Sequence, residues 1–166
     1  MAWFPKNPPV VLKYSPFRGA GHMSSVRLGP MTTTKMKAIV QTDPQERRSL
    51  ELQEVDVPQL QSGEVLVKVQ AAGVNRGDIL QTMGAYPPPP GASEILGLEA
   101  AGTIADAGDT DWEVGTEVGC LLAGGGYAEY VAVPQGQLLP LPQGYSVEET
   151  AAVVEVGCTV WSLSLI

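Results

Sequence analysis

The chain has 166 residues, of which 44% are hydrophobic and 17% are charged, so it can bury the core of one domain and part of a second. Its 19 glycines and 14 prolines argue against a helical bundle and favour short strands joined by turns. The net charge is −8, and residues 43–166 carry four basic against 18 acidic side chains. An acidic body disfavours nucleic acid as a partner, because it repels phosphates.

Cysteine content and hydropathy narrow the class of protein further. The two cysteines, Cys120 and Cys158, are too few for a disulfide framework or a thiolate metal cage, so we expect reduced thiols and a cytoplasmic location. Both lie in apolar stretches and are predicted to be unreactive core thiols. No run of 18 apolar residues occurs, so the sequence predicts no membrane span.

Residues 1–35 differ from the rest in charge. Residues 1–42 contain six basic side chains and no acidic one. We expect residues 1–35 to be a disordered leader. The alternative is a mitochondrial presequence, since such segments lack acidic residues, but only two arginines are present and four early prolines would interrupt an amphipathic helix.

Short strands dominate the middle of the chain, residues 36–145. MKAIVQ and LELQEVDVP are the first two predicted strands. In the strand GEVLVKVQAAGV, Val65, Val67 and Val69 are expected to point one way, with Lys68 and Gln70 on the other side. ILGLEAAGTIADAG reads as a strand of small residues that a neighbouring backbone can approach closely. WEVGTEVGCLL and GYAEYVAVP are two more predicted strands, and LLPLPQGYS is a connector.

Two helical segments interrupt this pattern. Residues 75–83 predict a short helix with Ile79, Leu80 and Met83 on one side, which ends before four consecutive prolines at 87–90. A second helix is predicted from Ser146, because Ser146 and Glu149 have the spacing of a capping box. This helix runs apolar to the last residue. The expected fold is therefore mainly β with short helices, a partly open β-barrel rather than a doubly wound sheet.

These segments together resemble a known superfamily. MKAIV, GEVLVKVQAAGVNRGDILQTMGAYPPPPGASEILGLEAAGTI, VGTEVGCLLAGGGYAEYVAVP and EETAAVVEVGCTVW, in this order, are similar to the medium-chain dehydrogenase/reductase superfamily. The likeness is strongest to zeta-crystallin-like NADPH:quinone oxidoreductases, in particular the tumour-suppressor-inducible quinone oxidoreductase branch. It covers about residues 36–161.

The resemblance implies a GroES-like catalytic β-barrel followed by an α/β Rossmann domain that binds most of the NADPH. Residues 36–145 would be the catalytic domain, and residues 146–166 the start of a helix that leads to the Rossmann domain. The glycines at 124–126 lack the G-x-G-x-x-G spacing and precede a strand. We therefore expect a truncated chain without the cofactor domain.

The resemblance also bears on zinc. Zinc alcohol dehydrogenases of the superfamily carry Gly-His-Glu where this chain has Gly97, Leu98 and Glu99. The first zinc cysteine would fall near Asn75, and the only histidine is His22. A catalytic zinc needs about three Cys, His or carboxylate ligands, so we expect none here.

Three residues are candidates for the active site by resemblance. Asn75 resembles the family's asparagine near nicotinamide and substrate, although it also suits a helix N-cap. Tyr86 resembles the tyrosine that contacts the quinone, and the rigid prolines after it would hold it over the pocket, whereas the alternative is packing on the proline rings. Thr159 resembles the threonine beside the nicotinamide, or else bonds to its own helix backbone.

Four further side chains are predicted to be structural. Asp78 would complement the dipole of the short helix. Glu99 would form a structural hydrogen bond. Tyr127 and Tyr130, three residues apart in a predicted strand, would face opposite sides and serve as packing residues.

The family function implied is hydride transfer from NADPH to a quinone, without zinc and without a covalent protein intermediate. One alternative is an alkenal or enone reductase that uses the same hydride. A second is a non-catalytic isoform or fragment, which lacks the cofactor domain. Family members commonly form homodimers.

Overall fold

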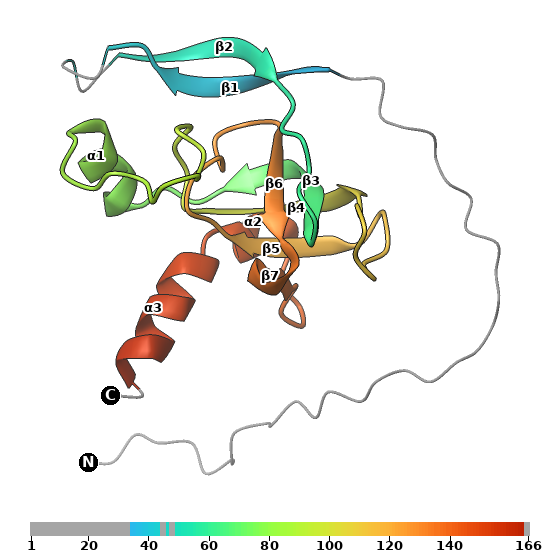
Figure 1. Ribbon diagram of the computed structural model, residues 1–166. Helices are drawn as coiled ribbons and strands as arrows, with labels where there is room; N and C mark the ends of the chain where they lie inside the picture. Colours follow the sequence, from blue (N-terminus) through green and yellow to red (C-terminus); the bar gives the residue numbers. More distant parts are fainter. Residues whose placement is uncertain (1–33, 44–45, 47–48, 165–166) are drawn as a thin grey trace, which may run out of the picture. The chain divides into compact units, whose positions relative to one another are not determined.

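The computed structural model describes residues 34–43, 46 and 49–164 (Figure 1). Strands outnumber helices, as predicted. The strands are β1 (Lys35–Gln41), β2 (Leu50–Asp56), β3 (Glu64–Ala72), β4 (Glu99–Asp106), β5 (Glu117–Leu121), β6 (Tyr130–Pro134) and β7 (Leu138–Pro140), and the helices are α1 (Arg76–Thr82), α2 (Val147–Ala151) and α3 (Val154–Ser164), with a 3-10 turn at Gln135–Gln137. The predicted leader or presequence lies almost wholly outside the described residues.

The main sheet has five strands in the order β6-β3-β4-β5-β7, and every neighbouring pair is antiparallel. The register between β3 and β4 shifts twice, once between Leu66 and Val67 and once between Val69 and Ala71. Such irregularities bend a strand and increase its twist. The sheet accordingly curls, which gives the partly open barrel expected from the sequence (Figure 1).

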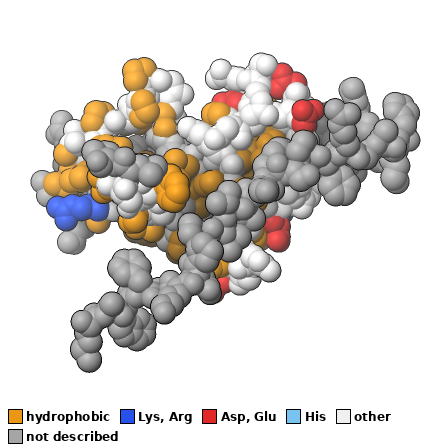
Figure 2. Space-filling view, turned by 90° about the horizontal axis from the view of Figure 1, so that it is seen from below, with side chains coloured by type: hydrophobic (Ala, Val, Ile, Leu, Met, Phe, Trp, Pro, Cys, Tyr) orange, Lys and Arg blue, Asp and Glu red, His pale blue; other side chains and the backbone are white. Residues whose placement is uncertain are grey.

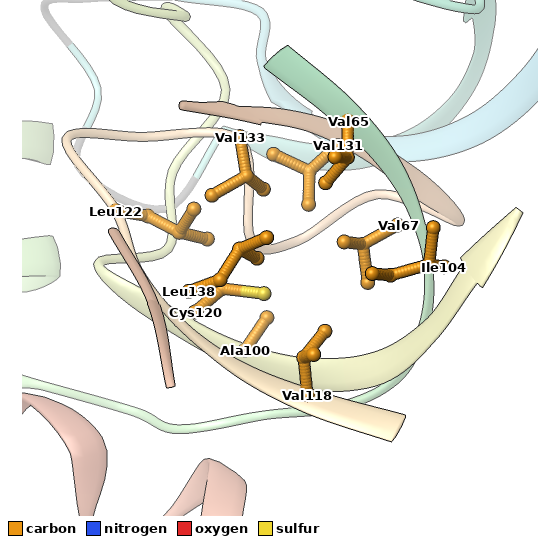
Figure 3. Packing of buried hydrophobic residues seen from close by; sticks show 10 residues of the cluster. All are labelled: Val65, Val67, Ala100, Ile104, Val118, Cys120, Leu122, Val131, Val133 and Leu138. Carbon is orange, nitrogen blue, oxygen red and sulfur yellow. The ribbon is translucent and has the colours of Figure 1, made fainter. Parts of the chain in front are cut away.

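The curled sheet encloses the principal core. Val65 and Val67 of β3 are fully buried, as their alternation predicted, and they point toward side chains from β4, β5 and β6 (Figure 3). The cluster consists of Val65, Val67, Ala100, Ile104, Val118, Cys120, Leu122, Val131, Val133 and Leu138. Burial of such aliphatic side chains stabilises each by about 1.5–3 kcal/mol relative to exposure.

Strands β1 and β2 form a separate two-stranded antiparallel sheet. An isolated bridge between Ala38 and Ala128 connects this sheet to the chain before β6, and the Ile39 N–H donates to the Tyr127 carbonyl at 2.8 Å. A second core of Met36, Ala38, Val57, Leu66 and Ala128 lies between them. Leu66 belongs to this cluster, so β3 is buried on both faces.

The small residues of β4 permit close packing, as predicted. A Cβ on Gly102 would overlap the carbonyl oxygen of Lys68 on β3. On the other side Ala101 packs against Val147 and Ala151 of α2. Glycine and alanine in this strand therefore let both a strand and a helix approach its backbone.

Several expectations about local structure need correction. Helix α1 buries Asp78 and Thr82 instead of the predicted apolar side, and Ile79 is 57% exposed. The predicted connector contains the strand β7, and the predicted last strand begins only at Tyr130. The predicted capping box is confirmed, since the Glu149 N–H donates to the Ser146 hydroxyl at 3.1 Å and the Ser146 N–H donates to the Glu149 carboxylate at 2.8 Å.

The helix that begins after Ser146 is also shorter than predicted, because α2 ends at Ala151 and α3 starts at Val154. Within α3 only Val154 is buried, whereas four apolar side chains, Val156, Val160, Trp161 and Leu163, are exposed. Figure 2, which views the molecule from the side on which α3 lies in Figure 1, shows many hydrophobic side chains on that face. Among the described residues, no helix is both long and apolar enough to cross a bilayer.

Candidate functional site

Helix α1 begins at Arg76, and its N-cap residue is Asn75, which has an extended conformation with φ −114° and ψ 155°. The Asn75 backbone N–H donates to Asp78 Oδ2 at 2.7 Å. Because Asp78 sits in the first turn, its carboxylate also complements the helix dipole, which agrees with its predicted structural role. The N-cap reading of Asn75 is thus correct for its backbone, and its side chain is left for another partner.

Asp78 is buried and has only neutral donors around it. Gly97 N–H donates to Asp78 Oδ1 at 3.2 Å, and the Tyr127 hydroxyl donates to Oδ2 at 2.7 Å. A buried carboxylate that accepts several hydrogen bonds avoids most of the cost of an unpaired charge. Asp78 therefore connects α1 with the loop before β4 and with Tyr127.

Tyr127 is not the packing residue that the sequence predicted. Its hydroxyl lies 2.7 Å from Asp78 and 3.3 Å from the Gly73 carbonyl oxygen. Burial, and then the adjacent Asp78 carboxylate, raise the pKa of Tyr127 well above its usual value. The phenol therefore keeps its proton and acts as a hydrogen-bond donor. Tyr130 packs against the second core, as predicted.

Glu99, the first residue of β4, is 3% exposed and accepts two hydrogen bonds. The Asn75 side-chain amide donates to Glu99 Oε1 at 2.9 Å, and the backbone N–H of Glu155 in α3 donates to Oε2 at 2.8 Å. A Cβ on Gly73 would overlap Oε1, so the carboxylate lies directly against that glycine. Glu99 thus has the predicted structural role, and its hydrogen bonds connect β4 with the start of α1 and with α3.

Thr159 lies one turn after Glu155, and its hydroxyl donates to Glu155 Oε1 at 3.0 Å. Asn75 and Thr159, far apart in the sequence, are therefore linked through Glu99 and Glu155. We call Asn75, Asp78, Glu99, Tyr127 and Glu155 the carboxylate network. Thr159 is exposed at its edge and does not bond to its own backbone through the hydroxyl.

Tyr86 stands apart from this network. It is 50% exposed and precedes the four prolines. Pro89 and Pro90 line a cavity of about 520 Å³ together with Ser93, Leu122 and other residues, but Tyr86 is not among its lining residues. A second, open cavity of about 410 Å³ is lined in part by Ala72 and Tyr127 and so borders the carboxylate network.

The resemblance assigns the position of Leu98 to a histidine in zinc-binding members of the superfamily. It is 9% exposed, and a Cβ on Gly77 of α1 would come within 2.5 Å of Leu98 Cδ1. Leu98 thus packs closely against the helix beside Asn75. In the described part of the chain, no three His, Cys, Asp or Glu side chains form a group suited to a metal ion.

The two cysteines differ. Cys120 is fully buried, and burial raises the pKa of its thiol to about 12, as expected of an unreactive core thiol. Cys158, by contrast, is partly exposed on α3 instead of buried in the core. The glycines at 124–126 also have a structural place, since a Cβ on Gly124 would come within 2.5 Å of the Ser93 carbonyl oxygen.

Comparison with known proteins gives a consistent assignment. Residues 61–143 match the family model "Alcohol dehydrogenase GroES-like domain". A phenolphthiocerol synthesis polyketide synthase from Mycobacterium bovis is 40% identical over 110 residues, which are 65% of this chain and 5% of that protein. The chain spans only 5–25% of the length of this and other curated relatives that match it well.

Solved structures of quinone oxidoreductases share the fold. That of Pseudomonas syringae pv. Tomato DC3000 is 30% identical with a TM-score of 0.66, over 77% of this chain and 40% of that one. That of Thermus thermophilus, described free and with NADPH, is 36% identical with a TM-score of 0.55, over 70% and 35%. Alcohol dehydrogenases are similar as well. The chain belongs to the alcohol dehydrogenase GroES-like domain family, within the medium-chain dehydrogenase/reductase superfamily.

Proposed function

We propose that this domain is the acceptor-binding half of a zinc-free, NADPH-dependent quinone oxidoreductase. The observation that carries the proposal is the setting of Asn75. Its amide donates one N–H to the buried Glu99 carboxylate, and apolar Leu98 lies against the same helix. The second N–H remains for a carbonyl oxygen of the acceptor. A carbonyl oxygen of a quinone can accept a hydrogen bond from such a donor.

Zinc does not fit these residues. Asn75 and Leu98 stand where the superfamily places two metal ligands, and a leucine side chain offers no donor atom. A quinone accepts hydride without the metal-assisted ionisation that alcohol oxidation uses. The residue types at these two positions therefore favour quinone reduction over zinc-dependent alcohol oxidation.

The described residues fit the nicotinamide end of NADPH better than its phosphates. Asn75 and the exposed Thr159 hydroxyl offer donors and acceptors suited to a carboxamide. NADPH, when bound, supplies the hydride. Asn75 and Tyr86 would orient the acceptor, and Thr159 would orient the nicotinamide. Tyr86 has the exposure that a ligand contact requires. We also expect a homodimer, because family members commonly form homodimers.

Binding of a naphthoquinone to the isotope-labelled chain tests the proposal by NMR. We expect the largest shifts at the Asn75 side-chain amide and at Tyr86, and at least about tenfold weaker binding in Asn75→Ala, as for one lost hydrogen bond in a desolvated site. Tyr86→Ala should also weaken binding, whereas Tyr145→Ala, at an equally exposed tyrosine, should not. Saturable binding that leaves Asn75 and Tyr86 unperturbed would contradict the proposal.

NADPH consumption then identifies the acceptor. With this domain joined to an NADPH-binding Rossmann domain, absorbance loss is compared for a naphthoquinone and an alkenal at equal concentration. Faster turnover of the quinone, lost in Asn75→Ala, is the expected result. Faster turnover of the alkenal than of the naphthoquinone would instead assign the enone-reductase activity to this site.

A further inference from the structure

The Glu99 carboxylate connects three elements that are distant in sequence. Glu99 itself opens β4, its Oε1 accepts from the side chain of Asn75 at the start of α1, and its Oε2 accepts from the Glu155 N–H in the first turn of α3. Each oxygen thus serves a different element. At 3% exposure, water does not compete for either bond.

Helix α3 has few other attachments to the domain. Val154 is its only buried residue, and its apolar side chains from Val156 onward are largely exposed. The chain breaks helical structure at residues 152–153, between α2 and α3. A carboxylate that accepts from a first-turn N–H both satisfies an orphan donor and complements the helix dipole. The Glu99 bond is therefore well placed to fix the direction of α3.

The same carboxylate fixes the Asn75 amide. Because Oε1 can only accept, the Asn75 NH₂ group must point toward Glu99, and this decides where the amide oxygen and second N–H point. Thr159 belongs to α3, so the direction of α3 also determines where Thr159 lies. Its hydroxyl donates to Glu155 Oε1 at 3.0 Å.

We propose that Glu99 is a positioning residue that couples Asn75 to helix α3, so that Asn75 and Thr159 are oriented as one unit. The value of this coupling for catalysis rests on the proposed function, but the coupling itself is a property of the free chain. Glu99 touches neither acceptor nor nicotinamide in this scheme and acts only through Asn75 and Glu155.

The chemistry of the site supplies two independent variants. In Glu99→Gln only the side-chain oxygen can accept, so one of the two bonds is lost while the size is kept. In Gly73→Ala the charge is kept, but the new Cβ overlaps Oε1 and displaces the carboxylate. Glu117→Gln, at an exposed glutamate of β5, is the matched control for the lost charge.

The coupling is measured by NMR on the ligand-free chain. Asn75→Ala should shift the backbone amides of Glu155 and Thr159, and exchange of α3 amides with solvent should accelerate about tenfold. In a Glu99→Gln background, Asn75→Ala should shift these two amides much less. Gly73→Ala should reproduce the shifts at both Asn75 and α3, and Glu117→Gln should shift neither.

Three outcomes overturn the proposal: Asn75→Ala leaves the α3 amides unchanged, it shifts them equally in both backgrounds, or Gly73→Ala leaves Asn75 and Glu155 unperturbed. Should Glu99→Gln fail to fold, Gly73→Ala and Asn75→Ala decide alone. Naphthoquinone binding distinguishes the two proposals, because a chain that shows the coupling but binds no quinone retains the role of Glu99 and loses only the proposed function. If both proposals hold, Glu99→Gln should weaken naphthoquinone binding as Asn75→Ala does, whereas Glu117→Gln should not.

Discussion

The main core and the carboxylate network are both buried, but different forces hold them. In the core, Val65, Val67 and Ile104 belong to one cluster of buried apolar side chains, and their position follows from alternation along the strands. In the network, Asp78 and Glu99 are buried among neutral donors. Apolar burial is non-directional, whereas each carboxylate oxygen fixes a particular donor. The core therefore gives the domain its stability, and the network determines where α1 and α3 lie.

Removal of a large core side chain should have the largest effect. The Ile104 side chain is 1% exposed, so Ile104→Ala leaves a cavity in the core. Such substitutions lower the free energy of unfolding by about 2–5 kcal/mol. Urea unfolding followed by circular dichroism should show a lower midpoint with an unchanged slope. Ile79→Ala, at an exposed isoleucine on α1, is the control and should change the midpoint little. Equal losses for both variants would mean that the core does not lie where described.

Loss of a network carboxylate should cost slightly less. Asp78→Ala removes the acceptor of the Asn75 and Gly97 N–H groups and the nearer acceptor of the Tyr127 hydroxyl, a loss of about 2–4 kcal/mol. Unlike the core variant, it should also shift the NMR signals of α1 and of Tyr127 in the folded state. Asp111→Ala, at an exposed aspartate, should do neither. A stable Asp78→Ala protein with unchanged α1 signals would show that the network is dispensable.

These two regions also mark how far sequence reasoning reaches. The strand of Val65 and Val67, the close approach at Gly102 and the capping box of Ser146 depend on local pattern, and the structure confirms them. The burial of Asp78 in place of Ile79, and the polar role of Tyr127, depend on partners that lie far away in the sequence. Sequence periodicity does not contain this information. The position of a glutamate among the small residues of GLEAAG is nevertheless a sequence signal for a buried acid.

The break between α2 and α3 illustrates the same limit. The run ETAAVVEVGCTVWSLSLI has no proline and only one glycine, so helix periodicity predicts a continuous helix. In the structure α3 starts anew at Val154, where the Glu155 N–H reaches Glu99. A tertiary hydrogen bond thus replaces a local cap. The roles of Asn75, Tyr86 and Thr159 came from resemblance alone and stay predictions.

Loss of a single neutral donor should have a smaller effect. Tyr127→Phe removes the bond to Asp78 and should cost about 1 kcal/mol near neutral pH. Because the pKa of Tyr127 is raised in the folded state, unfolded tyrosine loses its proton first as pH rises past about 10. Above this pH the free energy of unfolding of the wild-type protein therefore falls, whereas that of Tyr127→Phe does not fall for this reason. Urea midpoints of the two proteins should therefore converge between about pH 9 and pH 11. A constant difference would contradict the raised pKa.

The smallest effect should come from the surface ion pair. Lys35 Nζ lies 2.8 Å from Asp56 Oδ1, a distance within the range of the network contacts, yet both side chains are more than half exposed. The pKa of Lys35 is raised, because Asp56 accepts its hydrogen bond, but solvent and salt screen such a pair. Lys35→Ala should leave the urea midpoint unchanged within error at moderate salt, whereas Asp78→Ala lowers it. If the two variants lose stability equally, burial is not what distinguishes the carboxylate network from the surface. A short hydrogen bond to a carboxylate stabilises a fold strongly only where water is excluded, which is the condition that Glu99 and Asp78 meet and Asp56 does not.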